Sequence, residues 1–200
     1  MTKTRMEAFS DGVLAIIITI MVLELKVPHG DELADLRPLI PGFLSYALSF
    51  IYLGIYWNNH HHMLYVTHGV NGAILWANLH LLFWLSLVPF VTGWMGENHF
   101  TSAPTAAYGV ILLLAGIAYL LLQNAILRQE GPGSVLGAAV GRDRKGKISL
   151  LIYAIAIPLA FLRPWIAGAL YVVGVLSWLV PDSRIERTVS LHEPAKEPAA

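Results

Sequence analysis

Long apolar stretches alternate with short polar segments along the chain, and this pattern predicts membrane-spanning helices. A helix needs about 20 mostly apolar residues to cross roughly 30 Å of hydrocarbon. The stretches 39–57, 70–95 and 106–127 contain no Asp, Glu, Lys or Arg. The stretch 6–27 carries its charged residues near its ends. Each of these four stretches therefore predicts one transmembrane helix.

The last apolar stretch, residues 148–180, is too long for one span, because a single helix of that length would measure roughly 50 Å. Arg163 and Pro164 lie in its middle, and proline favours a turn or the start of a helix. We interpret the stretch as a tight hairpin of two short spans. The predicted spans are about residues 6–27, 39–60, 70–95, 106–127, 148–162 and 164–180.

Composition supports an all-α integral membrane protein. Hydrophobic residues make up 56% of the chain and charged residues 13%, whereas soluble domains carry about 25% charged residues. The 13 basic residues balance the 13 acidic ones, which argues against a nucleic-acid partner. The absence of cysteine from the sequence excludes disulfides, thiol nucleophiles and Cys-based metal centres.

The distribution of basic residues predicts an orientation for residues 1–182, the proposed six-helix domain. Cytoplasmic loops are enriched in Lys and Arg. With the N-terminus inside, ten of the 13 Lys and Arg residues fall in cytoplasmic segments, and the others are Lys26, Arg37 and Arg163. We therefore expect both termini in the cytoplasm. The polar tail 183–200 is expected to be disordered.

One face of the first predicted helix allows two interpretations. Gly12, Ile16, Thr19 and Leu23 fall within about 60° of one another on a helical wheel, and Ile20 flanks them. Such a stripe is typical of a helix–helix seam. It also suits a pore lining in which an aliphatic constriction lies beside a ring of hydroxyls. A pore of this kind requires several subunits around one axis.

A sequence signature in this helix resembles the transmembrane protein 175 family, the endolysosomal-type potassium channels and their prokaryotic relatives. The similar residues are Arg5-x-x-x-Phe9-Ser10-Asp11-Gly12, Ala15-Ile16-Ile17-Ile18-Thr19 and Leu23-Glu24-Leu25-Lys26-Val27-Pro28. Six predicted spans in one chain are similar to the prokaryotic type. The resemblance implies a homotetramer in a prokaryotic plasma membrane.

The resemblance implies that the first helix of each subunit lines a central pore. Ile16 matches the aliphatic constriction, Thr19 the hydroxyl layer linked to potassium preference, and Ile20 and Leu23 further pore positions. Ala15 stands where some members have serine, which argues against strong potassium selectivity. The family has no Thr-Val-Gly-Tyr-Gly filter, and the sequence has none. Permeating K⁺ ions are the expected ligands, and no cofactor is expected.

Polar residues of three helices are predicted to meet near the cytoplasmic side. Because polar groups in lipid need partners, a hydrogen-bonded network is expected, and the resemblance implies that it ties the first helix to its surroundings. The residues of this network are Arg5, Asp11, Trp57, His61 and Asn78. The alternative, a metal site, lacks histidines at spacings of three or four in the spans.

Three functional classes remain to be compared. No enzyme is expected, because paired intramembrane carboxylates and a nucleophile with a base are absent from the spans. A potassium-permeable channel is the preferred function. The alternatives are a small proton- or cation-coupled carrier that uses Asp11 and the cytoplasmic-side histidines, and a non-conducting scaffold. The tyrosines, together with Trp84, Trp94, Trp165 and Trp178, are expected at interfacial or lipid-facing positions.

Overall fold

The computed structural model describes residues 2–131, 133–134, 136–137 and 143–179, and within these ranges it contains helices and turns but no strand. The predicted tail, 183–200, lies outside the described residues. The main elements are α1 (Lys3–Ile20), η1 (Met21–Glu24), η2 (Leu33–Leu39), α2 (Ile40–Tyr65), α3 (Gly72–Ser86), α4 (Val88–Glu97), α5 (Ser102–Glu130), α7 (Arg144–Leu162) and α8 (Pro164–Leu179).

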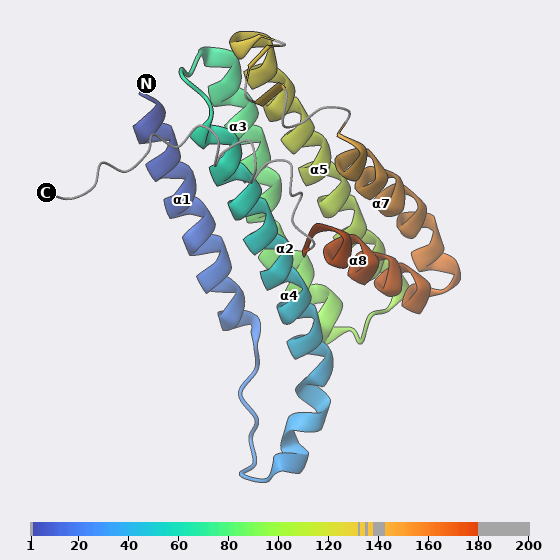
Figure 1. Cartoon of the computed structure of the whole chain (residues 1–200). Coiled ribbons are helices and arrows are strands. Elements are labelled where there is room, and N and C mark those ends of the chain that lie inside the picture. The colour runs from blue at the N-terminus through green and yellow to red at the C-terminus, as the bar shows by residue number, and fades with distance from the viewer. Residues whose placement is uncertain (1, 132, 135, 138–142, 180–200) are drawn as a thin grey trace, which may run out of the picture.

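The helices run alternately up and down a single bundle (Figure 1). The helix α1 lies at one edge beside α2, and α7 and α8 lie at the opposite edge. The longest helix, α5, packs against α3, α4, α7 and α8, and α1 packs against α2, α3 and α4. The N-terminus of α1 therefore shares one end of the bundle with the C-termini of α2 and α5.

Within the described residues, five helical segments are long and apolar enough to cross a membrane, and one further apolar helix, α8, is shorter. At 16 residues, α8 measures about 24 Å, less than the roughly 30 Å of a hydrocarbon core. The structure thus gives five candidate spans of full length where the sequence predicts six. These five are Lys3–Glu24, Leu33–Tyr65, Gly72–Glu97, Ser102–Glu130 and Lys145–Leu162.

The predicted third span is interrupted near its middle. The helix α3 ends at Ser86, and α4 starts at Val88 with Pro89 in its first turn. Proline lacks the N–H of a helical hydrogen bond and disfavours helical geometry in the residue before it. The two halves follow one another across the bundle, so the break changes the course of the span without ending it.

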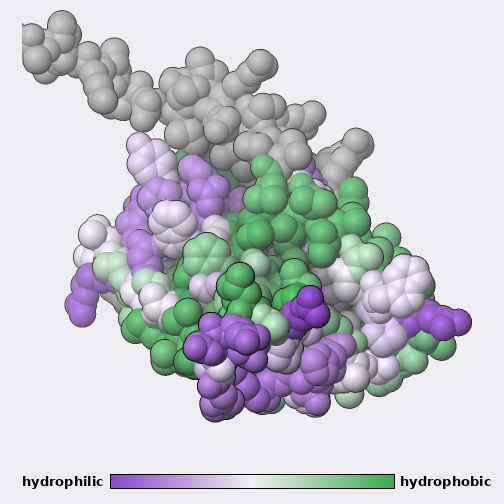
Figure 2. All heavy atoms as spheres, turned by 90° about the horizontal axis from the view of Figure 1, so that it is seen from below, coloured by the Kyte–Doolittle hydropathy of each residue, from purple (hydrophilic) through white to green (hydrophobic). Residues whose placement is uncertain are grey.

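The outer flank of the bundle is apolar, as lipid requires. In Figure 2 the bundle is seen from the end at which α2 begins: hydrophilic side chains gather on this end, and hydrophobic ones cover much of the flank. Large side chains such as Trp76, Phe161 and Trp165 are exposed. This surface agrees with an integral membrane protein, the class that the composition predicts.

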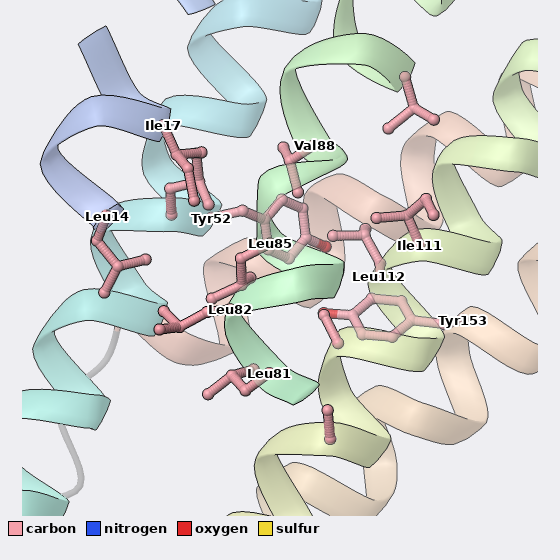
Figure 3. Packing of buried hydrophobic residues seen from close by; sticks show 14 of the residues in the cluster. Leu14, Ile17, Tyr52, Leu81, Leu82, Leu85, Val88, Ile111, Leu112 and Tyr153 are labelled. Atoms are coloured by element: carbon pink, nitrogen blue, oxygen red, sulfur yellow. The ribbon is translucent and has the colours of Figure 1, made fainter. Parts of the chain in front are cut away.

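The expectation that the tyrosines lie at interfacial or lipid-facing positions is wrong for four of them. Tyr52, Tyr108, Tyr153 and Tyr171 are 0–3% exposed, and Figure 3 shows Tyr52 and Tyr153 beside the aliphatic core residues. Their burial is possible because partners inside the bundle satisfy their hydroxyls. The Tyr52 hydroxyl, for example, donates to the carbonyl oxygen of Tyr171 at 2.6 Å.

Candidate functional site

The helix α1 has one face inside the bundle and one face outside it. Leu14, Ile17 and Met21 are at most 5% exposed and pack in the core. On the other face Ile16 is 58% exposed and Leu23 is 78% exposed. Gly12, Thr19, Ile20 and Phe9 are exposed as well. The whole stripe predicted from the helical wheel is therefore uncovered in the single chain.

The hydroxyl of Thr19 is held by its own helix. Thr19 Oγ1 lies 2.9 Å from the carbonyl oxygen of Ala15 and 3.0 Å from that of Ile16. The hydroxyl hydrogen is directed to these carbonyls, because a hydroxyl has one donor and two acceptor lone pairs. The oxygen thus presents its lone pairs on the exposed face, where it could accept a hydrogen bond or coordinate a cation.

The first span tightens at its far end. The α-helix stops at Ile20, η1 continues to Glu24, and Leu25 has an extended conformation. The regular helix is thus shorter than the predicted span 6–27, because 3₁₀ turns commonly close the C-terminal end of an α-helix. Leu23 lies in this tighter segment. It continues the exposed stripe, but in a 3₁₀ turn, which has three residues per turn and not 3.6.

A hydrogen bond joins the signature Asp of α1 to α2. Trp57 Nε1 donates to Asp11 Oδ1 at 3.1 Å. The His61 ring stacks on Trp57, with ring centroids 6.1 Å apart and an angle of 26° between the planes. Asp11 is half-buried, whereas Trp57 and His61 are exposed. This contact lies on the surface beside α1 and is separate from the buried contacts of the same helices.

A second, buried chain of hydrogen bonds connects α1, α3 and α2. Asn78 Nδ2 donates to Ser10 Oγ at 2.9 Å, and Asn78 Oδ1 lies 2.7 Å from His60 Nε2. Ser10 Oγ in turn donates to the carbonyl oxygen of Met6 at 2.8 Å. Each side chain in this chain is at most 2% exposed. These bonds hold α1 against its two neighbours within the apolar interior.

The histidine that contacts Asn78 is His60 and not His61. Successive residues point about 100° apart on a helix, so only one of the two can face α3. His60 shares the buried face of α2 with Leu53 and Leu64, which stand seven residues before it and four after it. The predicted network named His61, although this spacing already distinguishes His60 as the histidine on the buried face.

Arg5 stands apart from both sets of contacts. Its side chain is exposed and has no hydrogen-bond or ion-pair partner within the described part of the chain. Lys3 instead connects the start of α1 to α2: its Nζ donates to the carbonyl oxygen of Tyr65 at 2.9 Å and lies 3.7 Å from Glu7 Oε1. Among the described residues no group of three or more His, Asp or Glu could hold a metal ion.

The fold and this site define a helical membrane protein whose first helix combines an uncovered apolar face with a buried polar attachment. Residues 5–89, which include α1, α2 and α3, match the family described as endosomal/lysosomal potassium channel TMEM175. A potassium channel of Chryseobacterium sp. (strain P1-3) is 56% identical over 189 residues, which cover 94% of this chain and 98% of that protein. The chain belongs to the TMEM175 family, which is a family of channels and not of enzymes.

Two further relatives extend the comparison. The crystal structure of a lysosomal potassium-selective channel TMEM175 homolog from Chamaesiphon minutus matches with a TM-score of 0.76 at 26% identity, and the match covers 89% of this chain and 96% of that one. The endosomal/lysosomal proton channel TMEM175 of Gallus gallus is 40% identical over 80 residues, which cover 34% of this chain and 16% of that protein. The Chamaesiphon structure thus shares the fold along most of this chain, whereas the match to the Gallus gallus protein covers 34% of it.

Proposed function

We propose that this chain forms a potassium-permeable cation channel in which the α1 helices of four copies line a central pore. The observation that carries the proposal is the uncovered face of α1, with Ile16, Thr19, Ile20 and Leu23 exposed while the opposite face is buried. One helix has too narrow a face to enclose a pore, so several copies are required around an axis. The relatives named as potassium channels support the same function.

The aliphatic side chains of the stripe suit a gate that excludes water. Ile16 lies in the C-terminal half of α1, and four copies around an axis would form an apolar ring there. A narrow apolar ring resists wetting and thereby blocks ions until it widens. Ile20 and Leu23 would form two further aliphatic rings toward the outer end. Passage is passive in this mechanism, because none of these side chains binds or releases a proton.

The Thr19 ring supplies the oxygen atoms that a cation needs. Its hydroxyl hydrogen is directed to backbone carbonyls of α1, so the lone pairs remain for an ion in the pore. Oxygen ligands replace part of the hydration shell of a cation, and potassium gives up its hydration more easily than sodium does. We therefore expect K⁺ to be favoured over Na⁺, with Ala15 limiting the preference.

The polar contacts hold α1 at the pore. The Trp57–Asp11 bond and the Ser10–Asn78 bond fix the cytoplasmic half of the helix from two sides. Polar bonds of this kind are effective between membrane helices because the surrounding lipid offers no replacement partner. Arg5, Phe9 and His61 complete the signature and the surface of this segment, and the distribution of basic residues supports cytoplasmic termini in a bacterial plasma membrane.

The test is ion flux into liposomes that contain the purified protein. The parent should pass K⁺ faster than Na⁺. Ile16→Asn should raise K⁺ flux on the order of tenfold, which corresponds to a barrier lower by about 1.4 kcal/mol. The matched control is Ile155→Asn, because Ile155 is an isoleucine on α7 that is 46% exposed and lies outside the proposed pore. This control should leave the flux unchanged.

Two outcomes would contradict the proposal in different ways. Equal effects of Ile16→Asn and Ile155→Asn on K⁺ flux would show that α1 does not line the pore. Absence of passive flux in the parent, with uptake only under a proton gradient and loss of uptake in Asp11→Asn, would favour the coupled carrier. Absence of both kinds of transport from correctly inserted protein would leave a scaffold.

A further inference from the structure

A cavity between α2, α5, α7 and α8 has no assigned role. Its volume is about 40 Å³. A cavity of about 10–15 Å³ holds one water molecule, so this cavity suits a group of three or four heavy atoms. None of its lining residues belongs to α1, and it is therefore separate from the proposed pore.

Five of the ten residues that line the cavity are aromatic. Two pairs cross edge to face: Tyr52 and Tyr153 at 65° with centroids 6.1 Å apart, and Tyr56 and Tyr119 at 68° with centroids 6.2 Å apart. Trp178 of α8 completes the wall. Rings that cross at such angles surround a small volume from several directions. Ring faces are negative and attract cations.

Three hydrogen-bond donors of this wall are already used within the protein. Tyr52 donates to the carbonyl oxygen of Tyr171 at 2.6 Å, and Tyr119 donates to that of Asn59 at 3.4 Å. Trp178 Nε1 donates to Ser149 Oγ at 2.7 Å. These three side chains can therefore offer a ligand their ring faces and, for the tyrosines, oxygen lone pairs, but no donor. This part of the wall favours a cation over an anion.

A carboxylate lies at the edge of the cavity. Asp143 Oδ1 accepts the backbone N–H of Gly146, a lining residue, at 3.1 Å. Its other oxygen, Oδ2, is buried and has no hydrogen-bond partner among the described residues. A Cβ atom added at Gly146 would lie 2.5 Å from Oδ2, so this oxygen is close to the cavity wall. A buried, unpaired carboxylate oxygen favours a positive ligand beside it.

We propose that this cavity binds a small methylated ammonium cation. A trimethylammonium group has four heavy atoms and no N–H donors, which fits the volume and a wall of ring faces. Aromatic cages are the common site for such groups. The group could come from a free solute or from a lipid headgroup, and the chemistry of recognition is the same for both.

The test is calorimetric titration of the purified protein with choline. Choline should bind saturably, whereas its uncharged isostere 3,3-dimethylbutan-1-ol should not. Tyr56→Leu and Tyr119→Leu should each weaken binding about fivefold or more, because each removes a ring face. Tyr119→Phe keeps the ring and should bind as the parent does. Asp143→Asn removes the charge and should also weaken binding about fivefold.

Three controls make the result specific. Tyr46→Leu, on α2 outside the cavity, and Ile16→Asn, on the pore face, should leave choline affinity unchanged. Gly146→Ala should reduce choline affinity, since the added methyl displaces the Asp143 carboxylate. If the Leu variants fail to fold, Gly146→Ala and Asp143→Asn test the proposal in their place. Affinity for choline that is lower in phosphatidylcholine than in phosphatidylethanolamine nanodiscs, both of which are zwitterionic, supports a lipid as the source, and equal affinity supports a solute.

Three results would overturn the proposal. Absence of choline binding in the parent is the first. Equal binding of the uncharged isostere would make the cavity merely apolar. Loss of binding in Ile16→Asn with retention in Tyr56→Leu and Asp143→Asn would place choline in the pore instead. None of these results bears on passive K⁺ flux, so the channel proposal is tested independently.

Discussion

The two edges of the bundle differ in where their hydroxyl groups lie. At the α7–α8 edge the hydroxyls are inside: Tyr171 donates to the carbonyl oxygen of Thr105 at 3.0 Å and is fully buried. At the α1 edge Thr19 stands on an exposed face among aliphatic side chains. Thr19 satisfies its hydroxyl hydrogen with carbonyls of its own helix, so only the lone pairs of its oxygen are left uncovered on this face. Buried hydroxyls such as that of Tyr171 hold helices of the subunit together, whereas a role for Thr19 belongs to the proposed pore.

The comparison is sharpest within α1 itself, where two neighbouring aliphatic residues lie on opposite faces. Leu14 is 1% exposed and Ile16 is 58% exposed. Leu14→Ala should lower the free energy of unfolding by about 2 kcal/mol or more, because it leaves a cavity in the core. Ile16→Ala should change stability by about 0.5 kcal/mol or less and should instead raise ion flux. Denaturant unfolding in detergent and liposome flux measure the two effects.

A reversal of these effects would contradict the assignment of faces. If Ile16→Ala destabilised the detergent-solubilised monomer as much as Leu14→Ala does, α1 would be packed on both sides. If Leu14→Ala raised flux while Ile16→Ala did not, the pore would lie on the other side of the helix.

The sequence predicted the α1 edge better than the α7–α8 edge, for a physical reason. The stripe of α1 follows from helical periodicity within one segment. The contact of Tyr52 with Tyr171 joins residues 119 positions apart, and no local pattern distinguishes a tyrosine buried by such a contact from one at the membrane interface. In lipid both environments accept an aromatic ring, so hydropathy carries no signal for the difference.

The choice between His60 and His61 shows where local reasoning did have the information. Both lie on one helix, and only His60 is in register with Leu53 and Leu64 on the buried face. The predicted network contains His61, which stacks on the Trp57 ring and does not contact Asn78. The break before Pro89, by contrast, follows from the chemistry of a single residue and was predictable as a kink in the third span.

A smaller effect should separate the buried hydroxyls from the exposed one. Tyr171→Phe removes the donor to the Thr105 carbonyl without changing the ring, and should cost about 1 kcal/mol of unfolding free energy. The ratio of K⁺ to Na⁺ flux should stay as in the parent, because Tyr171 belongs to α8, which lies at the edge opposite α1. Tyr46→Phe is the matched control, since the structure gives its hydroxyl no hydrogen bond among the described residues. A changed ratio of K⁺ to Na⁺ flux in Tyr171→Phe would show that the buried hydroxyl also affects permeation.

The smallest effect on stability is expected at Thr19, and it should appear in selectivity alone. Thr19→Val keeps the shape and removes the oxygen, so unfolding should change by about 0.5 kcal/mol or less. The ratio of K⁺ to Na⁺ flux should fall, because cations lose an oxygen ligand in the pore. Thr19→Ser restores the hydroxyl and should restore the ratio, which separates the oxygen from the methyl group. If the valine variant kept the parental ratio while Ile16→Asn still changed the flux, α1 would line the pore and the choice between cations would be made at another ring.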